Sequence, residues 1–197
     1  MQLFISNREM SLTEMTGTEI DNYAPDFELP GVDGEVHHLA RYLENFKVVC
    51  VIFLSNQCPE VDLYIERIKQ LQKDFQNQGV IIIGMNANDA TISPNPKDSF
   101  EKMKEFAANN QLNFPYIRDV TQDVAESFGV DKTPEAFLLD REGKLRYRGR
   151  IDDNVNQPEA VKVAYLHQAI AQLLQDEEVT PSHTEVVGCS IKWRRKL

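Results

Sequence analysis

The sequence predicts an α/β fold with a mixed central β-sheet, helices on both faces, an N-terminal β-hairpin and a C-terminal tail. Two nearly unbroken apolar runs, residues 48–54 and 80–85, are typical of strands that are covered on both faces. A segment with helical periodicity separates them, as in two parallel strands joined by a crossover helix. A hairpin pattern later in the chain adds antiparallel strands to the same sheet.

The length of 197 residues suits one domain with extensions. Residues 1–23 are polar and aperiodic, so we predict an N-terminal extension there. The folded domain is expected at residues 24–175, and the tail, residues 176–197, is expected to dock on it. Ile191 and Trp193 indicate docking because large apolar side chains seldom stay in water.

The first half of the domain contains the predicted hairpin and both apolar strands. An Asp-Gly pair supplies the hairpin turn, and Gly79 ends the crossover helix. The predicted elements are a hairpin of residues 27–29 and 35–39, a short helix at 40–46, a strand at 47–54, a helix at about 58–78 and a strand at 80–85.

The second half begins with a loop at residues 86–96. Asp98 is predicted to cap the next helix, with Glu101 completing a capping box. The remaining elements are that helix, to about residue 110, an extended segment at 114–117, a brief helix at 121–129, a hairpin of residues 135–139 and 144–147, and a long helix at 158–175.

Charge and composition exclude several classes of protein. A net charge of -10 argues against a nucleic-acid partner, since phosphate binding needs clustered cations. The sequence contains no apolar run of the length that spans a membrane, and its N-terminus lacks the pattern of a secretory signal. Three cysteines are an odd number, which does not suit a disulfide framework. We therefore expect a cytoplasmic, reducing setting without membrane attachment.

Cys58 lies where the buried strand ends and the crossover helix begins. Pro59 supports this placement, because proline is favoured at the first position of a helix. The positive end of the helix dipole and the free backbone N–H groups there stabilise a thiolate, which is a nucleophile. We therefore expect Cys58 to be the most acidic of the three thiols. The alternative is a buried and inert cysteine, as we expect for Cys50 within the strand.

Several segments of the chain match a known pattern in the same order. They read APDFELP at 24–30, SNQCP at 55–59, IIIGMNAND at 81–89, TP at 133–134, FLLDREG at 137–143, YRGRIDD at 147–153 and GCSIKW at 188–193. Together they resemble the thioredoxin superfamily, and within it the peroxiredoxin-like, AhpC/TSA-type redoxins. The tail resembles a subgroup described as thiol–disulfide isomerase/thioredoxin-like proteins. The resemblance implies a thioredoxin-like fold over about residues 24–193.

The motif departs from thioredoxins, which carry two cysteines separated by two residues. Ser55 occupies the first of these positions, and serine has no redox chemistry, so ordinary two-cysteine exchange at this loop is excluded. The spacing of Ser55 and Cys58 instead resembles peroxiredoxins, and it implies that the Ser55 hydroxyl hydrogen-bonds the thiolate or a peroxide. Peroxiredoxins differ at two other positions, with proline where Val51 stands and arginine where Thr133-Pro134 stands.

The resemblance also implies a rim for substrate binding around Cys58. A cis peptide bond between Thr133 and Pro134 is expected beside the thiol. The remaining rim residues are expected to be Asn56, Gln57 and Pro59. No organic cofactor is implied, and the histidines lack the spacing of metal ligands, so no metal is expected.

Two residues have alternative interpretations that the sequence leaves open. Arg150 either forms a surface ion pair or reaches the cysteine pocket and favours the thiolate. Cys189 either resolves a sulfenic acid formed at Cys58 or only packs the tail onto the domain.

We therefore predict a thiol-dependent oxidoreductase with an antioxidant role. In this hypothesis Cys58 attacks a peroxide or a sulfur electrophile such as a disulfide. Cys189 or an external thiol, such as a thioredoxin-like protein, then restores the reduced state. The alternatives are a redox-silent binding or regulatory module, and a single-thiol protein disulfide isomerase.

Overall fold

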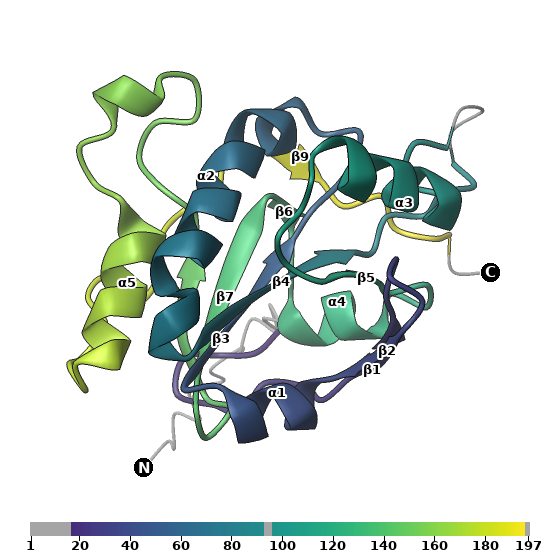
Figure 1. Cartoon of the computed structure of the whole chain (residues 1–197). Coiled ribbons are helices and arrows are strands. Elements are labelled where there is room, and N and C mark those ends of the chain that lie inside the picture. The colour runs from purple at the N-terminus through teal and green to yellow at the C-terminus, as the bar shows by residue number, and fades with distance from the viewer. Residues whose placement is uncertain (1–16, 93–95, 196–197) are drawn as a thin grey trace, which may run out of the picture.

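The computed structural model describes residues 17–92 and 96–195, and its centre is a five-stranded sheet in the order β5-β4-β3-β7-β8 (Figure 1). The strands are β3 (Val48–Phe53), β4 (Val80–Asn86), β5 (Tyr116–Arg118), β7 (Glu135–Asp140) and β8 (Leu145–Gly149). β3, β4 and β5 are parallel, whereas β7 is antiparallel to both β3 and β8. The predicted mixed sheet is therefore confirmed.

Helices cover both faces of the sheet (Figure 1). They are α1 (Leu39–Asn45), α2 (Pro59–Phe75), α3 (Phe100–Asn109), α4 (Asp123–Phe128) and α5 (Tyr165–Leu174). Successive side chains of a strand point to opposite faces, so Cys50 and Ile52 pack with α2 and α5, whereas Val51 and Phe53 pack with α1 and α4. β3 is buried along its whole length, as its apolar sequence predicts.

The predicted N-terminal hairpin is confirmed as β1 (Glu28–Pro30) paired antiparallel with β2 (Val36–His38). Gly34 lies in its turn with φ of +88°, a conformation that glycine adopts without steric cost. The crossover helix α2 ends at Phe75 and continues as a 3-10 turn, Gln76–Gln78, before the left-handed Gly79.

The predicted helix at residues 158–175 is wrong in its first half. Only a 3-10 turn, Pro158–Ala160, and α5 are helical. Between them the Lys162 N–H donates to the Asp153 carboxylate at 3.0 Å, and the Asp153 N–H donates to the Val163 carbonyl at 3.1 Å. These bonds hold residues 161–164 against the preceding loop, and the helix starts only after them.

The predicted capping box of α3 is also wrong. Ser99 is the N-cap residue, and its hydroxyl accepts a hydrogen bond from the Lys102 N–H at 3.4 Å. Asp98 is fully buried and turns away from α3 toward the loop that follows β3. The cap therefore falls one residue later than predicted, and the carboxylate has another role.

The predicted extension, residues 1–23, lies largely outside the described residues. Its described part is bound to the domain, because the Thr18 and Asp21 N–H groups donate to the carbonyls of Phe128 and Leu145. The loop predicted at residues 86–96 falls partly outside the described residues as well, since residues 93–95 are not described.

The tail docks on the domain, as predicted. A short strand, β9 (Cys189–Ser190), pairs antiparallel with β6 (Lys132–Thr133). Ile191 is buried, but Trp193 stays 40% exposed, so only one of the two apolar side chains behaves as expected. Hydrogen bonds between backbone and side chains hold the rest of this segment, including one from the Lys192 N–H to the Asn88 side chain at 2.8 Å.

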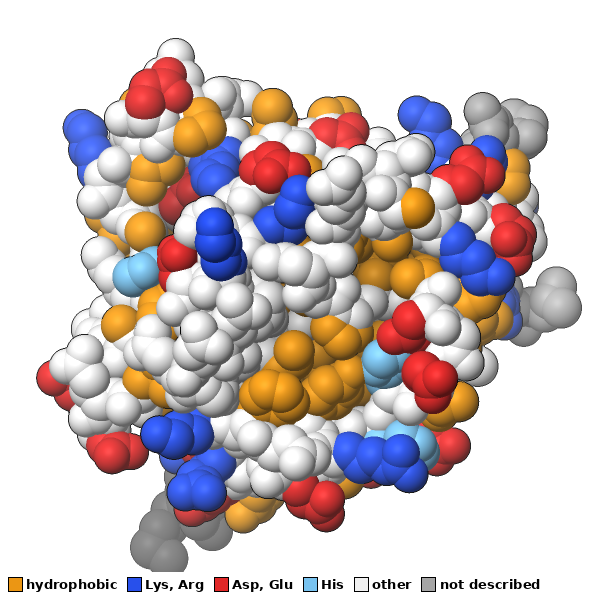
Figure 2. All heavy atoms as spheres, viewed as in Figure 1, with side chains coloured by type: hydrophobic (Ala, Val, Ile, Leu, Met, Phe, Trp, Pro, Cys, Tyr) orange, Lys and Arg blue, Asp and Glu red, His pale blue; other side chains and the backbone are white. Residues whose placement is uncertain are grey.

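Acidic and basic side chains are interspersed on the face shown in Figure 2, and an apolar area lies above α1. Within residues 17–92 and 96–195, no helix has the length and apolar character needed to cross a membrane.

Candidate functional site

Cys58 is the N-cap residue of α2, directly after the turn that follows β3. Its carbonyl accepts hydrogen bonds from the N–H groups of Val61 and Asp62, and Pro59 occupies the first helical position. The side chain packs into the core and has no exposed surface. The predicted position at the junction of strand and helix is therefore confirmed.

The Cys58 thiol faces two acceptor oxygens. Its Sγ lies 3.0 Å from the Thr133 carbonyl oxygen and 3.1 Å from Glu60 Oε2. A single S–H donates to one of them at a time. Within the described residues no backbone N–H group in the first turn of α2 donates a hydrogen bond to Sγ, so the predicted support from helix N–H groups is not seen. The carboxylate of Glu60 is instead the group that can take the proton when a thiolate forms.

The peptide bond between Thr133 and Pro134 is cis, as predicted. Thr133 is buried, belongs to β6 and places its carbonyl against the Cys58 sulfur. Pro134 is buried between β6 and β7. This segment therefore forms one wall of the site around Cys58.

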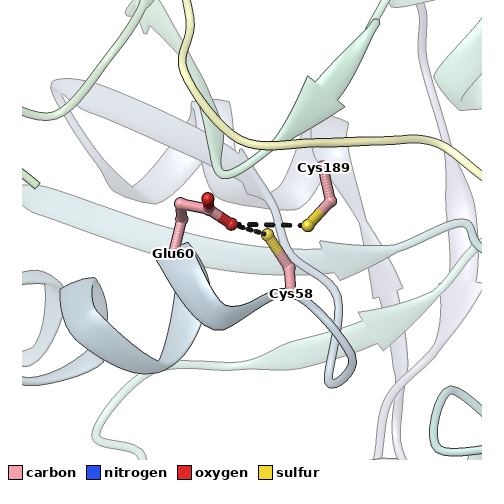
Figure 3. A group of neighbouring side chains, drawn as sticks. All are labelled: Cys58, Glu60 and Cys189. Atoms are coloured by element: carbon pink, nitrogen blue, oxygen red, sulfur yellow. Dashed lines mark hydrogen bonds between the residues drawn. The ribbon is translucent and has the colours of Figure 1, made fainter.

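Cys189 lies next to this wall, and its thiol points toward Glu60 and Cys58 (Figure 3). In the pairing of β6 with β9 it is the partner of Thr133, which fixes it beside the wall that contacts Cys58. The two sulfur atoms and Glu60 Oε2 all lie within 4.8 Å of one another, and the Cys189 thiol donates to Glu60 Oε2 at 3.3 Å. The carboxylate of Glu60 thus bridges two thiols that are 131 positions apart in sequence.

The electrostatic environment distinguishes the groups of this site. Burial, followed by the neighbouring Cys58 and Glu60, raises the pKa of the Cys189 thiol to about 12. The hydrogen bond from the Cys58 thiol lowers the pKa of Glu60, so the carboxylate is ionised at neutral pH. Complete burial strongly raises the pKa of Cys50, which agrees with its predicted role as a core residue.

Ser55 does not serve Cys58 as the resemblance implies. Its hydroxyl donates to the Asp98 carboxylate, at 3.3 Å from Oδ1 and 3.2 Å from Oδ2. The same carboxylate accepts the Asn56 N–H at 2.7 Å and the Gln57 side-chain amide at 2.8 Å. Ser55, Asn56 and Gln57, which were predicted to contact the substrate or the thiolate, therefore bind the buried Asp98 carboxylate. These bonds shape the loop in front of Cys58.

Two further residues complete this polar cluster. The Asn86 side-chain amide donates to Asp98 Oδ1 at 2.8 Å, and the Asn88 amide donates to Oδ2 at 3.1 Å. Asn88 also accepts the Lys192 N–H from the tail. The carboxylate thereby links the loop before Cys58 to the segment that carries Cys189.

Arg150 does not reach the cysteine. Its Nε donates to the Glu185 carbonyl at 2.8 Å, and its backbone N–H donates to the Thr184 hydroxyl at 3.0 Å. Among the described residues Arg150 forms no hydrogen bond or ion pair with Cys58, so the structure gives no support to its placement in the cysteine pocket, and Arg150 anchors the earlier part of the tail. Pro59 is exposed at the start of α2.

Sequence reasoning missed Glu60 and Asp98. Glu60 looks like an ordinary acidic residue in the first turn of a helix, where the dipole favours it. Its only signal is its position two residues after the candidate nucleophile. Asp98 matches a capping box, so its pattern indicates a different role.

Comparison with known proteins matches residues 20–148 to the AhpC/TSA family. Thiol-disulfide oxidoreductase ResA of Geobacillus thermodenitrificans is 31% identical over 134 residues, which cover 68% of this chain and 71% of ResA. Peroxiredoxin Bcp of Escherichia coli is 25% identical over 145 residues, which cover 68% of this chain and 86% of Bcp. Cys189 lies beyond the matched range of the family.

Solved structures extend the similarity to most of the chain. A hypothetical protein of Sinorhizobium meliloti, SMc02350, has a TM-score of 0.83 at 31% identity, covering 91% of this chain and 97% of that one. A putative thiol:disulfide interchange protein DsbE from Chlorobium tepidum has a TM-score of 0.61 at 22% identity, covering 81% of this chain and 98% of that one, and it shares the fold alone.

These matches confirm the predicted thioredoxin-like fold, and the names of the relatives confirm the prediction of an oxidoreductase enzyme. The family match spans well over half of the 197 residues and includes Cys58. The chain belongs to the AhpC/TSA family.

Proposed function

We propose that the protein is a thiol oxidoreductase that works through a Cys58–Cys189 redox pair. The observation that carries the proposal is the distance between the two sulfur atoms, which is at most 4.8 Å. A disulfide needs these atoms at about 2.05 Å, so the two sulfur atoms must approach each other further when the bond forms. The tail therefore provides the second thiol that the motif around Ser55 lacks.

The substrate we propose is a peroxide. The Cys58 thiolate attacks the nearer peroxide oxygen, the O–O bond breaks, and an alcohol or water leaves as Cys58 becomes a sulfenic acid. Cys189 then attacks the Cys58 sulfur, and a disulfide forms as water leaves. Glu60 contacts the Cys58 thiol, so in the first step it is positioned to accept this proton and pass it to the leaving oxygen. In the second step Cys189 loses its proton to solvent, and solvent returns a proton to the leaving hydroxide.

The burial of Cys58 supports a small electrophile, because its sulfur has no exposed surface while β9 stays in place. Similarity to peroxiredoxin Bcp supports the same substrate class. An external dithiol, such as a thioredoxin-like protein, reduces the Cys58–Cys189 disulfide by exchange and is itself oxidised. A cytoplasmic setting suits this cycle and stays a prediction.

A second candidate function is the reduction of a substrate disulfide. Similarity to thiol-disulfide oxidoreductase ResA favours it, and so does the partial exposure of Cys189. In this case Cys189 attacks the substrate disulfide and releases one thiol. Cys58 then attacks Cys189, which releases the second thiol and leaves the same internal disulfide.

We expect the Cys189→Ser variant to stop after the first oxidation. A peroxide pulse should leave wild-type protein with a Cys58–Cys189 disulfide, whereas the variant should carry a sulfenic acid at Cys58 that a dimedone probe traps. Mass spectrometry of the labelled peptides distinguishes the two products. Cys50→Ala is the matched control, because it removes a thiol outside the site.

The outcome also separates the rival functions. Absence of both products in wild-type protein would favour a redox-silent binding module. Turnover of disulfide substrates that survives in Cys189→Ser at the wild-type rate would favour a single-thiol isomerase and contradict the redox pair.

Formation of the internal disulfide should accelerate with pH. Resolution needs the Cys189 thiolate, and a pKa of about 12 leaves this thiol protonated near neutrality. Below that value the thiolate fraction rises with pH, so we expect an increase of about tenfold per pH unit between about pH 6.5 and 8.5. Quenched alkylation after a peroxide pulse measures the rate. A rate that does not change with pH would show that deprotonation of Cys189 does not limit this step.

A further inference from the structure

Three potential metal ligands converge between the start of α2 and β9 (Figure 3). Cys58 Sγ, Glu60 Oε2 and Cys189 Sγ all lie within 4.8 Å of one another, and the two sulfur–oxygen distances are 3.1 and 3.3 Å. A tetrahedral zinc ion with ordinary Zn–S and Zn–O bonds places such atoms about 3.5–3.8 Å apart. The two sulfur–oxygen distances need to lengthen by only a few tenths of an ångström, and the sulfur–sulfur distance needs to shorten by at most about 1 Å, to reach that geometry.

The backbone that carries these ligands is fixed before any ion binds. Cys58 is the N-cap residue of α2 and Glu60 lies in its first turn, so the start of the helix holds the two ligands in place. Cys189 is held by the register of β9 against Thr133, so the third ligand does not depend on a free chain end. Convergence of ligands from two anchored elements lowers the entropic cost of forming a site.

An ion has direct access to this position. Glu60 and Cys189 are half-buried at the surface, whereas Cys58 lies beneath them. Three protein ligands leave a fourth tetrahedral position for water or another small ligand. The cluster is thus an open site, unlike a four-ligand structural site.

We infer that the reduced protein binds one Zn²⁺ ion through Cys58, Glu60 and Cys189. Two sulfur ligands exclude Mg²⁺ and Ca²⁺, which prefer oxygen, and the carboxylate oxygen favours Zn²⁺ over Cu⁺. On binding, two Zn–S bonds and one Zn–O bond form, and the two thiols release two protons. No atom changes its oxidation state.

Bound zinc would hold both thiols reduced and block the disulfide between them. This consequence rests on the proposed redox pair, but zinc binding itself depends only on the reduced ligands. Zinc would therefore act as an inhibitor that is released when the ion is chelated.

The test is a titration of the reduced, full-length chain with Zn²⁺ in competition with a chromophoric chelator. We expect one ion per chain and release of about two protons per ion in weakly buffered solution. Cys58→Ser and Cys189→Ser should each weaken binding at least about 100-fold, because loss of an outer-shell partner alone costs 10–100-fold. Glu60→Gln should weaken it about tenfold or more.

Glu66→Gln is the matched control, since Glu66 is an exposed glutamate farther along the same helix. Its affinity for Zn²⁺ should equal that of the wild-type protein. Co²⁺ bound in place of Zn²⁺ should show sulfur-to-cobalt charge-transfer absorption that disappears in both cysteine variants. Wild-type affinity in Glu60→Gln, binding that survives loss of both cysteines, or stoichiometric binding of Mg²⁺ would overturn the inference.

Failure of the zinc site and failure of the redox pair give different results. A protein that forms the Cys58–Cys189 disulfide after peroxide but binds no Zn²⁺ overturns only the metal site. A protein that binds one Zn²⁺ with the expected loss in the variants, but forms neither sulfenic acid nor disulfide, keeps the metal site and overturns the proposed function.

Discussion

The Cys58→Ser variant is expected to lose turnover with peroxide and with disulfide substrates by about 10³-fold or more, because its hydroxyl forms neither a sulfenic acid nor a disulfide. The fold should tolerate this change. The serine hydroxyl replaces the thiol between two acceptor oxygens, those of Thr133 and Glu60, so the buried polar group keeps a hydrogen-bond partner.

Turnover coupled to an external dithiol, with thermal unfolding measured in parallel, checks this expectation. Cys50→Ala is the control, because Cys50 is also fully buried but lies within β3, away from Glu60 and Cys189. The control should retain turnover. Comparable activity in Cys58→Ser and Cys50→Ala would show that the chemistry does not use Cys58.

Local patterns account for the features that the sequence predicts well. The apolar run of β3 and the helical periodicity of α2 indicate their junction, and Pro59 marks the first residue of the helix. The cis bond at Thr133-Pro134 follows from family resemblance, since local propensity alone favours a trans bond. Docking of the tail follows from Ile191, although Trp193 is more exposed than expected.

The remaining features depend on contacts between segments far apart in the chain. Asp98 matches a helix cap locally, but the donors that surround its carboxylate come from the loop after β3 and from the end of β4. Glu60 becomes significant only when β9 brings Cys189 beside it. Arg150 carries the positive charge that would favour a thiolate, but its side chain donates a hydrogen bond to the carbonyl of Glu185 in the tail. The spacing of residues along the sequence does not indicate any of these contacts.

The Asp98→Asn variant is expected to lower the free energy of unfolding by about 2–4 kcal/mol, because a buried acceptor of charge-assisted hydrogen bonds is replaced by a partial donor. Asp98 has no exposed surface, and within the described residues no lysine or arginine forms an ion pair with it. Its stabilisation therefore comes from the donors that surround both oxygens: the Ser55 hydroxyl, the Asn56 N–H and the side-chain amides of Gln57, Asn86 and Asn88.

These donors cannot simply reverse to meet the new amide. The side-chain oxygen of Asn88 accepts a hydrogen bond from the Lys192 N–H. The side-chain oxygen of Asn86 accepts one from a guanidinium nitrogen of Arg118 at 2.9 Å. Rotation of either amide would break a bond elsewhere. The NH₂ group that the substitution introduces therefore meets donors on whichever side it lies, and one of the hydrogen bonds is replaced by a repulsive contact.

The loss extends to function because the cluster joins the loop before Cys58 to the tail. Weakening of the contact between Asp98 and Asn88 frees the amide that holds Lys192, three residues after Cys189. We therefore expect slower formation of the Cys58–Cys189 disulfide in addition to the lower stability. Urea unfolding measures the first effect, and quenched alkylation after a peroxide pulse measures the second.

Asp74→Asn is the matched control, because Asp74 lies exposed on α2 and accepts one hydrogen bond from the Gln70 side chain at 2.6 Å. Its stability should stay within about 0.5 kcal/mol of the wild-type protein. A shift in Asp98→Asn no larger than that of the control would mean that the buried carboxylate does not organise the loop. Lower stability with an unchanged rate of disulfide formation would mean that the Asp98 cluster does not help to position Cys189. The pairing of β6 with β9 would then be the contact that positions Cys189.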